Sequence, residues 1–176
     1  MKRIALVFFL FIPVFCFAQN KVALTHFWSI SWGLPIERVQ AILTERGLEP
    51  VREGNVLVTE ALYEGEESVM VFLFNRTNRF YSGNVFYTAS EDSVIRKYEH
   101  YRIVLARRYG GPDTAVEFYE EPFVKGDGRA VEAIRTDNAF FFTEWEFGNG
   151  GIASVSIFPT LDVRLSFSNP AFADAN

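Results

Sequence analysis

The sequence predicts an α+β fold in which two helices pack on an antiparallel sheet. Two stretches repeat apolar residues at helical spacing, and several shorter stretches alternate apolar and polar residues as strands do. Short turns separate the predicted strands, which is typical of an antiparallel meander. A helix and then a meander occur twice in this order, so the chain is also interpretable as a tandem repeat with halves at residues 32–88 and 90–167.

Residues 1–18 have the three parts of a secretory signal peptide. The segment begins with Lys2 and Arg3, continues with an apolar run and ends in a small residue, Ala18. The apolar run is shorter than the roughly 18 to 20 residues that a membrane-spanning helix needs. We therefore expect an exported protein that is periplasmic or secreted.

Cys16 is the only cysteine in the chain. The alternative to a cleaved signal is lipid anchoring through Cys16, but Phe15 stands where lipoprotein signals usually have a small residue. Once residues 1–18 are removed no disulfide can form, so packing alone must stabilise the mature chain. Residues 19–167 are enough for a single α+β domain. We expect residues 168–176, which are mostly small and polar, to be a flexible tail.

An extended arm leads into the first predicted helix. Trp28, Ile30 and Trp32 alternate with serines, which indicates a short strand with one face packed inward. Pro35 is suited to the first turn of a helix, because its missing N–H would be unpaired there in any case. The apolar residues that follow repeat at helical spacing as far as Gly47, a natural helix stop.

Strand patterns occupy most of the remaining chain. Residues 69–74 are apolar at every position, which predicts a central strand covered on both faces. Residues 90–109 form the clearest helix, with Ser90 as its cap and with glycine and proline after its end. The predicted strands are residues 56–63, 68–74, 80–88, 114–121, 140–147, 152–158 and 163–167.

Two short motifs resemble a family of uncharacterised exported bacterial proteins. Residues 32–39 resemble the WG-x-S-x-E-x-V pattern that starts a helix in that family, with Pro35 in place of a capping serine. Residues 109–112 (YGGP) resemble the YG-x-P pattern that closes the second helix. In order of elements the chain is also similar to the SmpA/OmlA outer-membrane assembly lipoproteins and the beta-lactamase inhibitor proteins. These resemblances imply an envelope or secreted binding module and bring no catalytic residues.

The mature sequence offers little for catalysis or metal binding. His26 and His100 are its only histidines and no cysteine remains, so a zinc site or a Cys/His nucleophile pair is excluded. Glutamates cluster at residues 64–67 and 117–121, where a solvated charged loop is the ordinary interpretation. Residues 125–128 resemble part of a calcium loop but lack its further ligands. We predict a protein that is not an enzyme and has no catalytic, cofactor or metal site.

Aromatic residues are the unusual feature, at 16% of the chain. Large rings can fill the core of a small sheet that lacks disulfides. Alternatively, one sheet face stays partly uncovered and its rings bind a partner or a ligand. The candidate structural or interaction aromatics are Trp28, Trp32, Tyr63 and Trp145.

These observations predict an exported, non-catalytic binding or scaffold module of the bacterial cell envelope, with another envelope protein as its partner. The alternative is a carrier that encloses a small apolar or lipid ligand in an aromatic-lined pocket. A formal net charge of −5 argues against nucleic acid as a partner. Nothing after the signal peptide is long and apolar enough to span a membrane.

Overall fold

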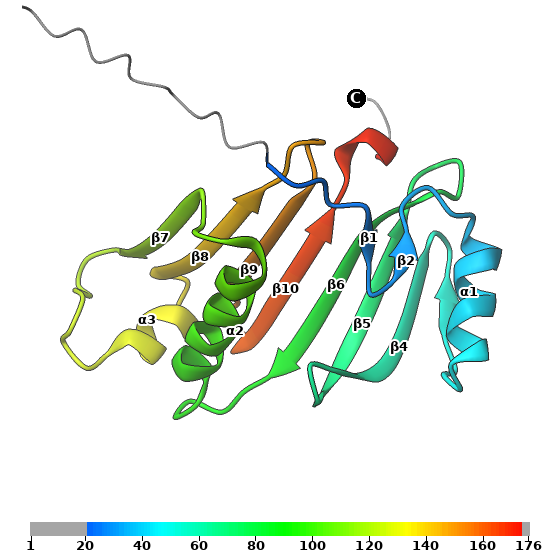
Figure 1. The fold of residues 1–176 in the computed structure, drawn as a ribbon. Coiled ribbons are helices and arrows are strands. Elements are labelled where there is room, and N and C mark those ends of the chain that lie inside the picture. Colours follow the sequence, from blue (N-terminus) through cyan, green and yellow to red (C-terminus); the bar gives the residue numbers. More distant parts are fainter. Residues whose placement is uncertain (1–20, 174–176) are drawn as a thin grey trace, which may run out of the picture.

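The computed structural model describes residues 21–173 and confirms the α+β fold (Figure 1). Eight antiparallel strands form one sheet in the order β3-β4-β5-β6-β10-β9-β8-β7. The predicted signal peptide lies outside the described residues. The strands of this sheet are β3 (Val51–Glu53), β4 (Val56–Tyr63), β5 (Glu66–Phe74), β6 (Phe80–Thr88), β7 (Thr114–Tyr119), β8 (Ala139–Glu146), β9 (Ile152–Ile157) and β10 (Asp162–Ser168).

The sheet is built from two meanders that meet in its middle. Helix α1 (Ile36–Glu45) precedes strands β3 to β6, and helix α2 (Val94–Tyr109) precedes strands β7 to β10. A short helix, α3 (Ala130–Arg135), lies between β7 and β8. The meanders join where β6 pairs antiparallel with β10, from Thr88 opposite Asp162 to Ser82 opposite Ser168. The order of a helix and then four strands therefore occurs twice.

The helix ends follow the local sequence. Pro35 caps α1, and Gly47, with φ of +79°, lies just beyond its last turn. Helix α2 begins at Val94, four residues later than predicted, because Ser90 closes a turn in which its carbonyl accepts the Val94 N–H at 2.9 Å. Gly110 ends α2 with φ of +90°, a conformation that glycine adopts without a steric penalty.

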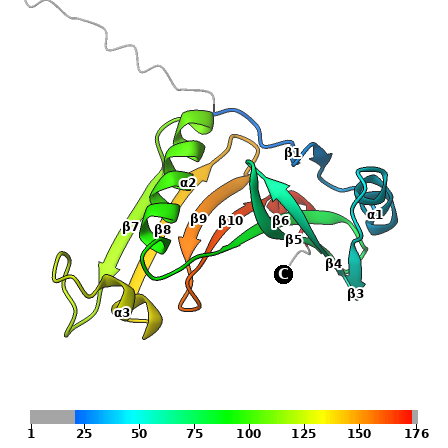
Figure 2. The same cartoon turned by 90° about the horizontal axis from the view of Figure 1, so that it is seen from below.

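One face of the sheet, the core face, is covered by the helices and by the N-terminal arm (Figure 2). The arm forms a small hairpin from β1 (His26–Phe27) and β2 (Ile30–Ser31). The Phe27 ring lies directly on Gly83 of β6, where a Cβ atom would come within 2.1 Å of it. Only glycine fits at that position, so the arm and the sheet pack without an intervening side chain.

The opposite face, the open face, has no helix over it. It consists of the side chains that alternate with those of the core face. On β5, Met70 and Phe72 are buried on the core face, whereas Val69 on the open face is 40% exposed. The prediction that residues 69–74 are covered on both faces was therefore wrong. The strand is central in the sheet, but only one of its faces is packed.

The C-terminal segment packs against the start of the first helix region. Ser168 belongs to β10, and the Asn169 side chain accepts the Ala171 N–H at 3.1 Å to cap a short 3₁₀ helix, η1 (Pro170–Phe172). The Phe172 ring lies beside Gly33, where a Cβ atom would be 2.5 Å from it. The structure thus differs from the predicted tail at residues 168–173, and the remaining residues of that tail lie outside the described range.

Candidate interaction surface

Three of the four candidate aromatic residues lie inside the core. Trp32 is 6% exposed, and its Nε1 donates a hydrogen bond to the carbonyl of Leu24 at 2.9 Å. Trp145 is 2% exposed, and its Nε1 donates to the carbonyl of Gly110 at 2.9 Å. Tyr63 is 5% exposed. These rings hold the arm, the end of α2 and the sheet together, and the structure does not bring them into one accessible site.

Trp28 differs from the other three because it is only half-buried, at the tip of the arm hairpin. Trp28 and Ser29 are the two turn residues, and both have positive φ, at 47° and 61°. Turns of this kind usually use glycine or asparagine, so the backbone is strained here. The guanidinium of Arg46 lies 4.6 Å from the Trp28 ring and its Nη1 donates to the Trp28 carbonyl at 3.1 Å. Trp28 is thus held against the end of α1.

The histidines do not form a site with each other. The Nδ1 atom of His26 lies 3.0 Å from the Thr25 hydroxyl in the arm. His100 is exposed on α2, where its ring contacts the edge of Tyr101. Within residues 21–173 no group of three or more histidine, aspartate or glutamate side chains is arranged to hold a metal ion.

The two glutamate clusters are engaged by cations. In the turn between β4 and β5, Glu64 pairs with Arg108 at 2.5 Å and Glu66 pairs with Lys97. Both cations project from α2, so these pairs tie the turn to the helix. In the second cluster Glu117 pairs with Lys125. The paired carboxylates therefore have a structural explanation.

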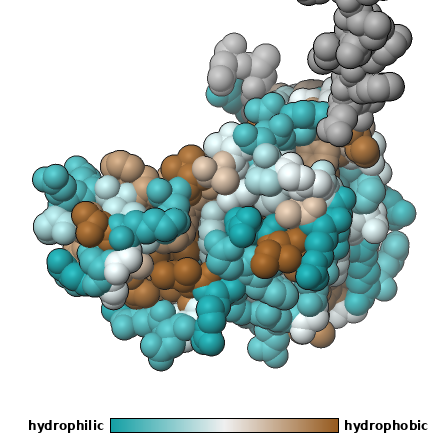
Figure 3. Space-filling model, turned by 60° about the vertical axis from the view of Figure 1, so that its left-hand side comes forward, coloured by the Kyte–Doolittle hydropathy of each residue, from teal (hydrophilic) through white to brown (hydrophobic). Residues whose placement is uncertain are grey.

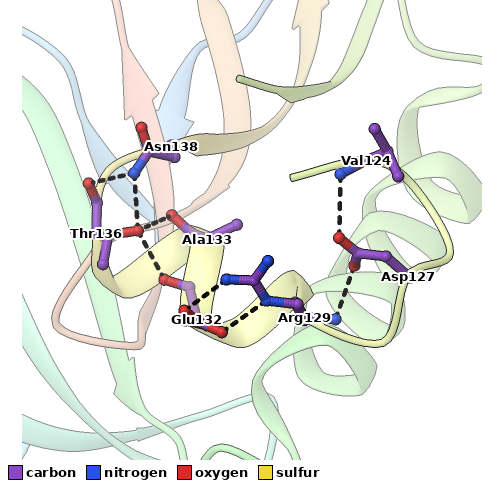
Figure 4. A network of polar contacts seen from close by, with 7 residues as sticks. All are labelled: Val124, Asp127, Arg129, Glu132, Ala133, Thr136 and Asn138. Atoms are coloured by element: carbon purple, nitrogen blue, oxygen red, sulfur yellow. Dashed lines mark hydrogen bonds and ion pairs between the residues drawn. The ribbon is translucent and has the colours of Figure 1, made fainter. Parts of the chain in front are cut away.

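The turn at residues 125–128 is closed by its own aspartate. The Asp127 carboxylate accepts the backbone N–H of Arg129 at 2.8 Å and that of Val124 at 3.1 Å (Figure 4). These backbone hydrogen bonds hold the pKa of the Asp127 carboxyl below its ordinary value. Arg129 in turn pairs with Glu132 at 2.8 Å. Both carboxylate oxygens of Asp127 are thus occupied by the loop, which leads directly into α3.

Exposed apolar residues gather on the open face. Half-buried residues join them there, with the rings of Phe140 and Phe142 stacked at 5.7 Å between centroids. Figure 3 shows the β7 end of the molecule from the side of the helices, where apolar patches also lie among hydrophilic residues. The most exposed apolar residues of the open face are Leu62 (64%), Val51 (60%), Phe118 (57%), Phe140 (49%), Val69 (40%) and Val116 (37%).

The strand register places two of these residues, Val69 and Val116, in one row that crosses the sheet from β4 to β7. Each residue of the row lies opposite the next on the neighbouring strand, so their side chains are direct neighbours on the open face. The row begins with a glutamate on β4, has apolar side chains on β5, β6, β8 and β7, and has an arginine and a serine in its middle. In order from β4 to β7 it consists of Glu60, Val69, Phe86, Arg164, Ser156, Phe142 and Val116.

Arg164 is half-buried in the middle of this row. Its guanidinium lies 4.6 Å from the ring of Phe158, which is itself 6.5 Å from the ring of Phe86. Burial lowers the pKa of the Arg164 guanidinium from its ordinary value. The Nε atom of Arg164 and the Oγ atom of Ser156 are both buried, and within residues 21–173 neither has a hydrogen-bond partner.

Comparison of the chain with protein-family models, with curated proteins and with solved structures finds no match. The resemblance to exported bacterial proteins is therefore still a prediction. The residues of the open face, which the sequence did not single out, come from the structure alone. The one signal for them was the alternation in residues 163–167, which placed Arg164 on the exposed side of its strand.

Proposed function

We propose that the protein is an exported, non-catalytic binding module of the bacterial cell envelope that contacts a protein partner through the open face of its sheet. The observation that supports this most directly is the unequal covering of the sheet. Every helix packs on the core face, while Val69, Phe118 and Phe140 leave much of their apolar surface in water on the other. Contiguous exposed apolar surface on a folded protein commonly marks an interaction site.

The size of the open face is compatible with a protein partner. Eight strands spaced about 4.8 Å apart give a surface about 34 Å across. A protein interface of ordinary size buries about 800 Å² on each partner, which fits within such an area. Aromatic residues are also the kind that contribute most to protein interfaces, especially where polar residues surround them.

The proposal places the protein in the periplasm or outside the cell, with its N-terminal segment as the export signal. Within residues 21–173 no helix has both the length and the apolar character to cross a membrane. Mass spectrometry of protein exported by a bacterial host tests this placement. We expect a chain that lacks residues 1–18, with processing insensitive to globomycin. Globomycin-sensitive processing would instead identify Cys16 as a lipid anchor.

The partner interaction is tested with variants that each replace an exposed apolar side chain by serine. Phe118→Ser and Phe140→Ser remove exposed rings from the open face, and Ile103→Ser removes a 42% exposed side chain from α2 on the other side of the sheet. Partners captured from an envelope extract are identified and each affinity is measured with purified protein. We expect the two open-face variants to weaken binding tenfold or more and Ile103→Ser to have no effect. Equal binding by all three variants would overturn the proposal.

A second candidate, the carrier of a small apolar ligand, rests on a cleft beside the arm. This cleft has a volume of about 430 Å³ and lies between residues 22–29 of the arm, Tyr63, the end of α2 and Phe147. Its volume is within the range of small-molecule sites. Native mass spectrometry of purified protein tests this function, which requires an apolar ligand to co-purify. A ligand-free protein that binds its partner through the open face would exclude it.

A further inference from the structure

Arg164 is a residue of the open face whose guanidinium finds no hydrogen-bond acceptor within residues 21–173. The guanidinium has five N–H donors. Among residues 21–173 it makes no hydrogen bond and no ion pair, and its guanidinium lies over the ring of Phe158. A half-buried cation without an acceptor lowers the stability of a fold, because it loses hydration and gains no compensating bond.

Other arginines of the chain show what a satisfied guanidinium looks like here. Arg108 pairs with Glu64 at 2.5 Å, and Arg135 pairs with Glu91 at 2.8 Å. Arg46 also lies over an aromatic ring, but it donates to a backbone carbonyl as well. Arg164 lies over the Phe158 ring but, within residues 21–173, has no hydrogen-bond acceptor. In a chain with a net charge of −5, an unpaired and half-buried cation is therefore the exception.

The carboxylates nearest to Arg164 on the open face are engaged elsewhere or lie too far away. Asp162, two residues earlier on the same face, accepts hydrogen bonds from Thr88 at 3.1 Å and Thr160 at 2.8 Å. Glu60 belongs to the same row but is three strands away, and Glu144 lies two strands away in the next row. In the described part of the chain, the open face thus has no carboxylate paired with Arg164.

We propose that Arg164 receives the carboxylate of an aspartate or glutamate side chain from the protein partner, with an apolar side chain of the same partner segment packed on Phe86 and Phe158. The proposal rests on the proposed function, since it assigns the chemistry of the partner that the open face binds. Arginine recognises carboxylates through paired, charge-assisted hydrogen bonds, which are strongest where water is excluded. Ser156 lies opposite Arg164 on β9, and its buried hydroxyl likewise has no hydrogen-bond partner within residues 21–173.

A side chain from a protein fits this site better than the head group of a fatty acid. The open face has a hollow of about 660 Å³ beside Leu62, Val69 and Phe86, but Arg164 does not line it, so this hollow would not enclose an alkyl chain at the point where Arg164 anchors it. A protein segment covers the row and excludes water from the ion pair at the same time. Complementary charge of this kind gives an interface its register and its specificity.

The test uses two blocked dipeptides as probes, acetyl-Asp-Phe-amide and acetyl-Asn-Phe-amide, which differ in one charge. NMR titration follows the Nε–H signal of Arg164 and the backbone signals of β9 and β10. We expect the aspartyl probe to bind at least tenfold more tightly than the asparaginyl probe, because hydrogen bonds to charged groups are the stronger ones. Hexanoate serves as a third probe, and tighter binding of hexanoate than of the aspartyl dipeptide would overturn the proposal in favour of a lipid.

Two variants separate recognition from folding. Arg164→Gln should abolish the preference for the aspartyl probe with little change in the unfolding temperature, since it loses the contact with the Phe158 ring but no hydrogen bond or ion pair. Arg46→Gln, the matched ring-stacked arginine, should leave the preference unchanged. A large fall in the unfolding temperature of Arg164→Gln, or a preference that survives in it, would show that Arg164 has a structural role and contradict the proposal.

The outcomes also separate this inference from the proposed function. If both dipeptides shift the open-face signals equally, the face binds apolar side chains and only the carboxylate assignment fails. If neither dipeptide shifts them, the carboxylate assignment fails again. The proposed function fails with it only if partner binding is also unaffected by Phe118→Ser and Phe140→Ser.

Discussion

The two faces of the sheet differ in how far they bury phenylalanine, as two neighbouring residues of β8 show. On β8, Phe141 points to the core face, is 4% exposed and packs edge-on against Tyr98 at 5.7 Å between ring centroids. Its neighbour Phe140 points to the open face and is 49% exposed. Because side chains alternate along a strand, adjacent phenylalanines serve different purposes. One contributes to the stability of the fold and the other leaves apolar surface in water.

Polar groups show the same difference between the faces. On the core face, the buried Thr143 hydroxyl lies 2.7 Å from the Tyr98 hydroxyl, so both groups are satisfied. On the open face, Ser156 Oγ and Arg164 Nε are buried without a partner. The core face thus satisfies this pair of polar groups from within the chain, although the Tyr101 hydroxyl on the same side has no hydrogen-bond partner within residues 21–173. The open face is incomplete in both its apolar and its polar groups, which is what a surface built for another molecule requires.

The largest effect on stability is expected from a variant that tests whether the N-terminal arm packs as part of the core. Trp32→Ala removes a buried ring that packs on Phe80 at 4.9 Å and donates a hydrogen bond to the arm. We expect the free energy of unfolding to fall by about 3–5 kcal/mol, the usual cost of truncating a buried tryptophan. Urea denaturation followed by circular dichroism measures it. A variant that stays fully stable but loses its partner would move Trp32 to the interaction surface and break the distinction between the faces.

The next prediction compares the two phenylalanines of β8 directly. Phe141→Ala should lower the free energy of unfolding by about 3–4 kcal/mol, whereas Phe140→Ala should change it by less than about 1 kcal/mol. The same denaturation experiment on both variants gives the difference. Similar losses for the two variants would mean that the open face is packed against something in the folded protein.

The smallest expected effect concerns tyrosines of the core face at alkaline pH. Burial raises the pKa of Tyr63 and of Tyr101 to about 12, above the ordinary value of 10.0. Between these values the unfolded chain loses these protons and the folded chain keeps them. This contribution to stability is therefore fully present below about pH 10 and should be lost from there towards pH 12, at a rate below the limit of about 2.7 kcal/mol per pH unit for two such tyrosines because solvent screening reduces the shifts.

Denaturation at pH 8, 10 and 11, with tyrosinate absorbance as a second readout, measures this fall. Tyr101→Phe is a clean control, because the Tyr101 hydroxyl has no hydrogen-bond partner within residues 21–173. The variant should be as stable as the natural chain at pH 8 and should lose less stability above pH 10. An equally steep loss in the variant would assign the alkaline transition to other groups.

Long periodic patterns made most of the fold predictable. The bounds of β4 and β6 agree with the prediction, and α2 ends where Gly110 follows it. Strand β3 was not predicted, because three residues that include Arg52 and Glu53 show no readable alternation. Helix α3 was missed for a similar reason, since six residues span fewer than two helical turns.

The candidate site was predictable only in outline. An uncovered aromatic face was one of two alternatives, but the large rings of Trp32 and Trp145 proved to be in the core. An apolar strand such as β5 looks the same in sequence whether its second face is packed by a helix or left for a partner. The isolation of Arg164 depends on where Asp162 directs its carboxylate and on which strands lie beside β10. Such facts belong to tertiary structure and have no signature in local sequence.

The position of β10 has a consequence for the order in which the molecule assembles. It is the last strand in the chain, yet it lies between β6 and β9 near the middle of the sheet. Its pairing with β6 joins Thr88 to Asp162 across 74 residues, and contacts between such distant residues form slowly. During synthesis the first meander can form early with β6 as an unpaired edge, open to pairing with other chains. The centre of this sheet, rather than its rim, is therefore where a nascent chain most needs protection from aggregation.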